Sequence, residues 1–368
     1  MRTFSRYALL TVGLVGCLDL DALQSGRNNS PDLSLPVVQD MTSPAPVDMT
    51  VNLVDLASPR DMGTPDLLPV FAWTAVTPAV APMNLYGISG VGSGATASIY
   101  VVGQAATVIK SVAGAAFIAG TGPTGATADF NALWVKDAMN LWVADGAGKV
   151  YTSTDGATTA LAWADKMTGA SMVQRAISGR AGKDDVLVAG DDTTKGLLLN
   201  PTAGTTWSAA NCAQGEKVLG VWGSPNYYVF VGDKLKASRG TNPAMGCTPM
   251  VQMGVTGAPS ITAVSGTSDT DAWMVTADGQ LINADLTAAN DKMIRQKNLG
   301  GATFSALWVK SATDIWIVGS KIWQWDGMNI VDKTGNLPTG YTLTGVWSDG
   351  TSIWVIGNKS NVGAIFKH

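Results

Sequence analysis

Two residue types on which many enzymes and metal sites depend are almost absent from the chain. Histidine occurs once, as His368, and glutamate once, as Glu216, among 28 acidic residues. One terminal histidine excludes an interior histidine base and any site built from several histidines. Aspartate favours turns whereas glutamate favours helices, so this usage, together with 42 glycines, is typical of an all-β protein. The net charge of −4 predicts no nucleic-acid partner.

The N-terminus has the pattern of an export signal. Arg2 and Arg6 precede the apolar run 7–15, which is too short to span a bilayer. The sequence LVGC, which ends at Cys17, resembles the bacterial lipobox. This resemblance implies a signal peptide over 1–16 and a lipidated Cys17 that carries acyl chains such as palmitate. An ordinary signal peptide with a chance cysteine is the alternative. Leu18 in place of aspartate favours the outer over the inner membrane under the enterobacterial sorting rule.

Residues 17–69 differ in composition from all that follows. Beyond Cys17 the stretch 18–69 holds eight aspartates, seven prolines and no aromatic residue. Such a segment cannot bury enough apolar surface to offset the entropy of ordering, which predicts a disordered stalk. A flexible stalk of this length reaches about 40 Å, and a proline-stiffened one about 160 Å. A docking motif for a partner is the alternative.

A unit of about 43 residues recurs seven times after residue 81. It contains an element like LGVWG (219–223) and one like DIWIVG (314–319). The sixth unit shows four short apolar runs, at 304–309, 314–318, 321–325 and 329–333. Four strands per unit of this length predict an all-β, seven-bladed β-propeller over 70–368. The central aliphatic residue of the first element lies at Ile88, Leu133, Ile177, Val221, Val264, Leu307 and Val346.

Large and small side chains alternate around the predicted ring. The position after the central aliphatic is Ser89, Trp134, Ser178, Trp222, Ser265, Trp308 and Trp347. This alternation predicts that adjoining blades interdigitate. We therefore interpret the 13 tryptophans as core residues, with a base-stacking or sugar-stacking platform as the alternative. The seventh unit is one strand short, and 70–77 has the pattern of the missing strand, so we expect the two segments to pair and remove the exposed edge.

Two turns carry a family resemblance. The second unit has Ser153, Asp155 and Gly156 in STDGATT, and the third has Gly204 and Trp207 in PTAGTTW. Both resemble the Asp-box of sialidase-type propellers. The chain resembles Asp-box lipoprotein propellers, including those similar to photosystem II assembly factors. In those families the Asp-box is a structural turn, so the resemblance implies no catalytic role for these residues.

A sialidase-like glycosidase is the enzymatic alternative. That chemistry needs an arginine trio, a Tyr/Glu nucleophile pair and an acid Asp, whereas the repeats contain only Arg175, Arg180, Arg239 and Arg295. We therefore predict no catalytic residues and no cofactor. Aspartate pairs could be calcium ligands, but turn capping is our interpretation, and we predict no metal site. These pairs are Asp184-Asp185, Asp191-Asp192 and Asp269/Asp271.

Cys212 and Cys247 are the cysteines that remain beside Cys17. An even pair in an exported protein suggests a disulfide, with two buried thiols as the alternative. Together these features predict a lipid-anchored envelope module that contacts an unknown envelope protein or glycan through the propeller loops. The long loop 90–98 makes the rim of the first blade a candidate contact. The rival prediction is a glycan-acting envelope enzyme.

Overall fold

The computed structural model describes the propeller domain. The described residues are 71–78, 82–156, 161–167, 173–180, 182–191, 197–200, 207–209, 217–241, 246–255, 257–287 and 292–368. Internal contacts divide the chain into Met1–Pro65 and Asp66–His368. The predicted signal peptide, Cys17 and the stalk up to residue 69 lie outside the described residues. Within the described part, no helix is long and apolar enough to cross a membrane.

The described strands form seven sheets, which we number as blades 1 to 7 in chain order, with the strands of each blade given from the innermost outward. Blade 1 contains β2 (Leu85–Val91), β3 (Ser98–Gly103), β4 (Thr107–Ser111) and β5 (Ile118–Ala119); blade 2 contains β6 (Phe130–Val135), β7 (Leu141–Asp145), β8 (Val150–Ser153) and β9 (Trp163–Met167). Blade 3 contains β10 (Val173–Gly179), β11 (Val186–Asp191), β12 (Leu197–Asn200) and β13 (Ser208–Ala209); blade 4 contains β14 (Val218–Gly223), β15 (Tyr228–Gly232), β16 (Ala237–Gly240) and β17 (Thr248–Pro249). Blade 5 contains β19 (Ile261–Ser268), β20 (Asp271–Thr276), β21 (Gln280–Ala284), β22 (Lys292–Asn298) and β18 (Val251–Met253); blade 6 contains β23 (Phe304–Ser311), β24 (Asp314–Gly319), β25 (Ile322–Trp325) and β26 (Ile330–Asp332); blade 7 contains β27 (Thr342–Ser348), β28 (Ile353–Lys359), β29 (Val362–Lys367) and β1 (Thr74–Val76).

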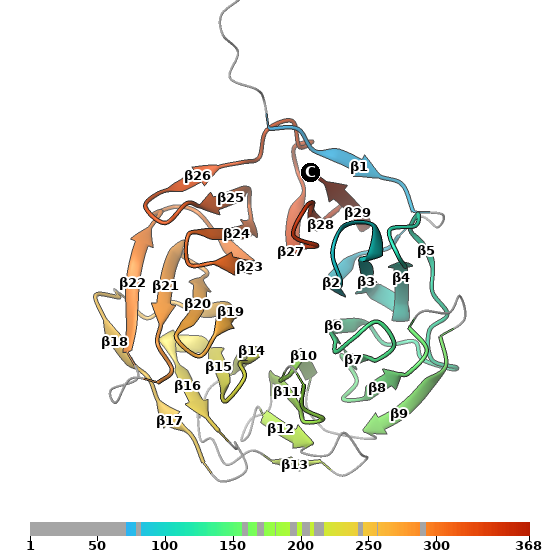
Figure 1. Cartoon of the computed structure of the whole chain (residues 1–368), viewed down its shortest axis with the longest axis horizontal. Helices are drawn as coiled ribbons and strands as arrows, with labels where there is room; N and C mark the ends of the chain where they lie inside the picture. Colours follow the sequence, from blue (N-terminus) through green and yellow to red (C-terminus); the bar gives the residue numbers. More distant parts are fainter. Residues whose placement is uncertain are drawn as a thin grey trace, which may run out of the picture. The chain divides into compact units, whose positions relative to one another are not determined.

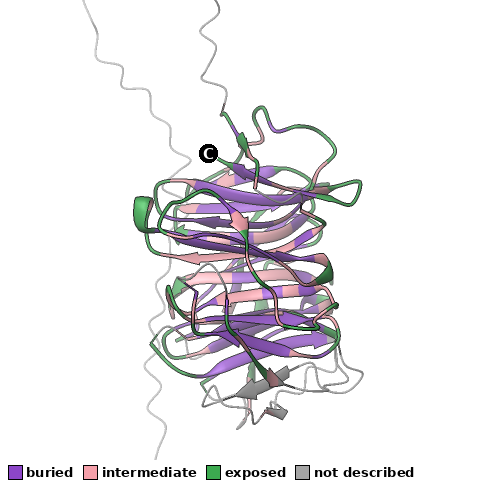
Figure 2. Ribbon diagram, turned by 90° about the vertical axis from the view of Figure 1, so that its right-hand side faces the viewer, coloured by how far each residue is buried: buried purple, intermediate pink, exposed green. Residues whose placement is uncertain are grey.

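The blades follow one another around a closed ring (Figure 1). Each innermost strand contacts the innermost strand of the next blade, and β27 of blade 7 contacts β2 of blade 1. Buried residues fill the middle strands of the sheets, and exposed residues gather at the turns (Figure 2). The expected all-β propeller fold is confirmed.

The ring closes where the sequence predicted. Strand β1 pairs antiparallel with β29, with Thr74 opposite Lys367 and Val76 opposite Ile365. The segment just before it is anchored as well, because Trp73 is 5% exposed and its main-chain N–H donates to Asn336 Oδ1 at 2.5 Å. The last blade thus combines the two ends of the domain in one sheet, and β29 is not left as an unpaired edge strand.

Blade 5 departs from the four-strand expectation. Strand β18 lies on its outer edge and pairs in parallel with β22, with Val251 opposite Lys292 and Met253 opposite Ile294. This blade therefore has five strands, and the prediction of four strands in every unit was wrong here. The Gln252 Nε2–H donates to the Leu235 carbonyl of blade 4 at 2.8 Å, which fixes the added strand beside the blade junction.

Tryptophan rings pack on glycines of the neighbouring blade. A Cβ built on Gly179 of blade 3 would lie 2.5 Å from Cζ2 and Cζ3 of Trp134 in blade 2. Likewise, a Cβ on Gly90 of blade 1 would lie 2.9 Å from Cζ2 of Trp347 in blade 7. These approaches are closer than carbon atoms tolerate, so only glycine fits beneath the ring. The large-and-small alternation therefore does reflect interdigitation: Trp134, Trp222 and Trp347 each pack on the glycine that follows the small residue of the next blade.

Every innermost strand begins with a β-bulge. The pairing register shifts by one residue near the start of each, and the bulged residues are Tyr86, Asn131, Arg175, Leu219, Thr262, Ser305 and Thr344. Several of these side chains donate to main-chain carbonyls of the next blade: Asn131 Nδ2 to Gln174 O at 2.8 Å, Thr262 Oγ1 to Phe304 O at 2.9 Å and Thr344 Oγ1 to Leu85 O at 2.9 Å. Bulges re-aim side chains, and here they turn polar groups toward the adjoining blade.

Candidate functional site: the loop face

One end of the ring carries the segments that join the first strand of each blade to the second, and the third to the fourth. Antiparallel pairing places both kinds of turn at the same end, which we call the loop face. The other turns, between second and third strands and between blades, lie at the opposite end. Functional residues of propellers are expected on such loops because the sheets beneath hold them in place.

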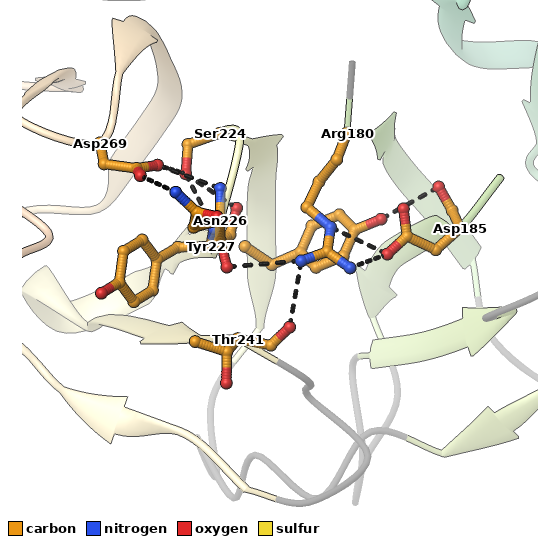
Figure 3. Close-up of polar contacts among 8 residues, drawn as sticks. Arg180, Asp185, Ser224, Asn226, Tyr227, Thr241 and Asp269 are labelled. Carbon is orange, nitrogen blue, oxygen red and sulfur yellow. Dashed lines mark hydrogen bonds and ion pairs between the residues drawn. The ribbon is translucent and has the colours of Figure 1, made fainter. Parts of the chain in front are cut away.

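Arg180 fastens blade 3 to blade 4 on the loop face (Figure 3). Its Nε–H donates to Asp185 Oδ2 at 2.8 Å, and its Nη2–H contacts the same oxygen. Its Nη1–H donates to the carbonyls of Asn226 at 3.4 Å and Thr241 at 3.2 Å, both in blade 4. The guanidinium carbon lies 5.1 Å from the ring centre of Tyr228. Arginine suits this role because its planar group can hydrogen-bond and stack at once.

Tyr228 completes this junction from beneath. The ring is fully buried, and its hydroxyl donates to the Asp185 carbonyl at 3.0 Å. Burial, followed by the nearby Asp185 carboxylate, raises the pKa of the Tyr228 hydroxyl above its usual range. The hydroxyl therefore stays protonated and acts as a permanent donor between the two blades.

Asp269 fastens blade 5 to blade 4 in the same manner (Figure 3). Its carboxylate accepts hydrogen bonds from Ser224 Oγ at 2.6 Å, from Asn226 Nδ2 at 2.6 Å and from the Asn226 main-chain N–H at 3.2 Å. Burial disfavours the charged carboxylate, but the hydrogen bonds from Ser224 and Asn226 outweigh it and hold the pKa of Asp269 below its usual value. The loop of blade 4 is thus held on both sides.

The linkage extends to blade 2. Lys136 pairs with Asp184 of blade 3, whose side chain is 72% exposed. The turn that begins at Lys136 is itself fixed, because Asp137 Oδ1 accepts the main-chain N–H groups of Met139 and Asn140 at 2.9 and 2.8 Å. The loop face of blades 2 to 5 is therefore a continuous set of loops connected by polar contacts, and we call this set the polar clamp.

The arginines that a sialidase-like mechanism would need lie in three different blades, with Arg175 and Arg180 in blade 3, Arg239 in blade 4 and Arg295 in blade 5. Arg175 lies in the bulge of β10, and Arg180 lies beyond the other end of that strand. The guanidinium carbon of Arg239 lies 4.5 Å from the ring centre of Tyr227, and Arg295 lies on β22. Glu216 lies outside the described residues. The Asp184, Asp185 and Asp269 carboxylates take part in the polar clamp, and the described residues contain no cluster of three potential metal-ligating His, Cys, Asp or Glu side chains.

The first Asp-box-like turn packs against blade 1. The Asp155 main-chain N–H donates to Ser153 Oγ at 3.3 Å, and a Cβ on Gly156 would lie 2.7 Å from the Tyr100 hydroxyl. Lys110 of blade 1 is fully buried, and its Nζ donates to the Gly156 carbonyl at 3.4 Å. Burial lowers the pKa of Lys110, while the Asp155 carboxylate opposes that change. Sequence analysis did not single out this lysine. Of the second such turn, Gly204 lies outside the described residues.

Tryptophans at the starts of outermost strands tie each of three blades to the blade before it. The indole Nε1–H of Trp163 donates to the Thr121 carbonyl at 2.6 Å. In the same way, that of Trp207 donates to the Lys166 carbonyl at 2.8 Å, and that of Trp73 to the Lys333 carbonyl at 2.8 Å. We call Trp73, Trp163 and Trp207 the tryptophan latches. Trp207 of the second Asp-box-like turn thus has a structural contact.

Cys247 is disulfide-bonded. It follows Gly246 at the start of the segment that leads into β17. Its predicted partner, Cys212, lies outside the described residues, so the proposed Cys212–Cys247 pairing stays a prediction.

The fold is similar to that of solved propellers. No protein-family model matches the chain, and no curated protein sequence matches it. The structure "YCF48 bound to D1 peptide" is 15% identical with a TM-score of 0.59, covering 80% of this chain and 96% of that chain. YCF48 from Cyanidioschyzon merolae is 14% identical, with a TM-score of 0.59 and coverage of 80% and 98%. The WD40 propeller domain of Doa1 is 12% identical, with a TM-score of 0.58 and coverage of 80% and 95%. Identities this low establish the propeller fold alone.

Proposed function

We propose that this chain is a binding and scaffold module, held at the cell envelope by a lipid on Cys17, that contacts a protein or glycan through its loop face. The polar clamp is the observation that carries this proposal. Loops that are already fixed lose little conformational entropy on binding, so a clamped surface suits recognition. The similar structure of YCF48 bound to a D1 peptide supports a protein partner. The stalk would set the distance between the ring and the membrane.

Site-specific photo-crosslinking in intact cells tests the loop face. A photoreactive residue replaces Met139, which is 43% exposed on the loop face, or Ala277, which is exposed at the opposite end of the ring. We expect a discrete crosslinked species from position 139 and none from position 277. Equal crosslinking from both positions, or none from position 139, would overturn the assignment of the contact surface.

The anchor is tested separately. Cys17→Ser removes the thiol that a lipid would occupy, so we expect the protein to leave the outer-membrane fraction for the soluble envelope fraction. Mass spectrometry of the wild-type N-terminus should show an acylated cysteine. A Cys17→Ser variant that fractionates like wild type would show that the anchor is not at this residue.

A further inference from the structure

A cavity of about 420 Å³ opens between blades 1 and 2 at the rim of the ring. Its walls include the segment 121–126, which connects blade 1 to blade 2, together with Lys149, Tyr151, Trp163 and Asp165. We call it the rim pocket. Lys149 lies beside a turn between second and third strands, at the end opposite the loop face, whereas Trp163 begins β9 at the loop-face end. The pocket therefore runs along the outer side of the blades, and its lining does not include Met139, the residue used to test the loop-face contact.

The pocket exists because blade 1 is narrow at this point. Its outermost strand β5 has two residues, whereas β9 of blade 2 has five. The chain beyond β5 reads TGPTGA over 121–126, with small side chains, and a Cβ on Gly125 would meet no atom within 4 Å. The outer half of blade 2 therefore faces open space where a longer neighbouring strand would cover it.

The groups beside that space are two aromatic side chains and an ion pair. Trp163 is half-buried, and its latch bond to the Thr121 carbonyl at 2.6 Å holds the ring in position. Tyr151 is buried in the hydrophobic cluster against which Trp163 packs, and it lies opposite Asp165 in the strand pairing. Lys149 Nζ lies 3.7 Å from Asp165 Oδ2, and both side chains remain partly exposed. The pocket thus offers an aromatic surface next to one strong donor and one strong acceptor.

We propose that the rim pocket binds the pyranose ring of a neutral saccharide. A pyranose presents an apolar C–H surface that packs on an aromatic ring, and hydroxyl groups that donate and accept hydrogen bonds at its edge. Lys149 and Asp165 can satisfy both roles, and their opposite charges favour an uncharged ligand. Hydroxyls of Thr121 and Thr124 add further partners at the wall. The volume falls within the range of about 300–1,000 Å³ that small-molecule sites occupy.

The test uses saturation-transfer difference NMR with a fixed probe set: the methyl glycosides of glucose, galactose and mannose, N-acetylglucosamine and N-acetylgalactosamine. At least one sugar should bind the wild-type chain. Trp163→Leu should abolish that binding, whereas Trp207→Leu, which removes the equivalent latch one blade further on, should leave it intact. Asp165→Asn, at an exposed position, should weaken it about tenfold, the loss expected for one charge-assisted hydrogen bond.

Three results would overturn the proposal: no saturation transfer to any of the five sugars, binding unchanged in both Trp163→Leu and Asp165→Asn, or equal loss in Trp163→Leu and Trp207→Leu. Circular dichroism of each variant shows whether the ring has folded. Because crosslinking from Met139 does not involve this pocket, failure of the sugar test leaves the loop-face proposal standing, and failure of the crosslinking test leaves this one standing.

Discussion

Replacing Gly179 by alanine tests whether the blades interlock as described. The added methyl would lie 2.5 Å from Cζ2 and Cζ3 of Trp134, while carbon atoms prefer about 3.5–4.0 Å. An overlap of about 1 Å must be relieved by moving the ring or the two sheets. Because the ring packs between blades 2 and 3, we expect Gly179→Ala to cost about 1–3 kcal/mol of unfolding free energy, the range for overpacked cores.

Denaturant unfolding of four variants, Gly179→Ala, Gly300→Ala, Trp134→Leu and the Gly179→Ala/Trp134→Leu double variant, measures this effect. Gly300→Ala is the matched control, since a Cβ there would meet no atom within 4 Å and its backbone is not left-handed, and it should change stability by less than about 0.5 kcal/mol. Trp134→Leu removes most of the clashing ring, so Gly179→Ala should cost clearly less in that background. If the alanine costs the same with tryptophan or leucine at position 134, the proposed steric contact is wrong.

Three further predictions concern the clamp, the closure and the cysteines. Hydrogen bonds lower the pKa of Asp269 in the folded state, so wild type should be more stable than Asp269→Ala by about 1 kcal/mol. This advantage should be complete above the ordinary aspartate pKa and fade as the pH falls through the lower pKa of folded Asp269. An advantage that stays constant from about pH 7 to about pH 2 would contradict this. Deleting residues 70–77 should lower the melting temperature of the whole ring, and Trp73→Ala alone should cost about 3–5 kcal/mol, whereas unchanged melting would refute the closure. Ellman titration of the denatured, non-reduced protein, with Cys17 replaced by serine, should find no free thiol if Cys212 and Cys247 are bridged; two free thiols would exclude the bridge.

The repeat made most of the fold predictable. The strands predicted for the sixth unit agree with β23 to β26 to within two residues at each end. The predicted closing strand pairs with β29. Both predictions succeeded because a blade buries both faces of its sheet, which imposes the same apolar runs and turns on every unit.

Prediction from the sequence missed two features of the structure, for opposite reasons. Strand β18 has three residues and no repeat counterpart, so no periodic signal marks it. Lys110 falls within the apolar run of β4, where a lysine normally predicts a solvent-facing position, yet it is fully buried because the next blade covers it. Propensity and alternation describe a strand by itself, and they cannot state which surface the neighbouring blade will cover.

The polar clamp could be predicted from the sequence only in part. Its partners are about one repeat apart in sequence, as with Arg180 and Asn226 or Ser224 and Asp269, so the period indicates that they lie on adjoining blades. Whether a carboxylate reaches across the junction or caps its own turn depends on the loop conformation. Asp269 reaches across, whereas Asp137 caps its own turn. The residue types are alike, so sequence alone did not separate the two.

Specific binding in a ring of near-identical units must come from departures from the repeat, because positions that the units share are occupied by contacts between blades. The tryptophan latches illustrate this point. Trp73, Trp163 and Trp207 make the same indole-to-carbonyl contact with the preceding blade. In blade 2, however, the neighbouring outermost strand is two residues long, and the wall beside Trp163 consists of small side chains. A residue that is structural in each of the three blades thereby also borders a pocket in this one.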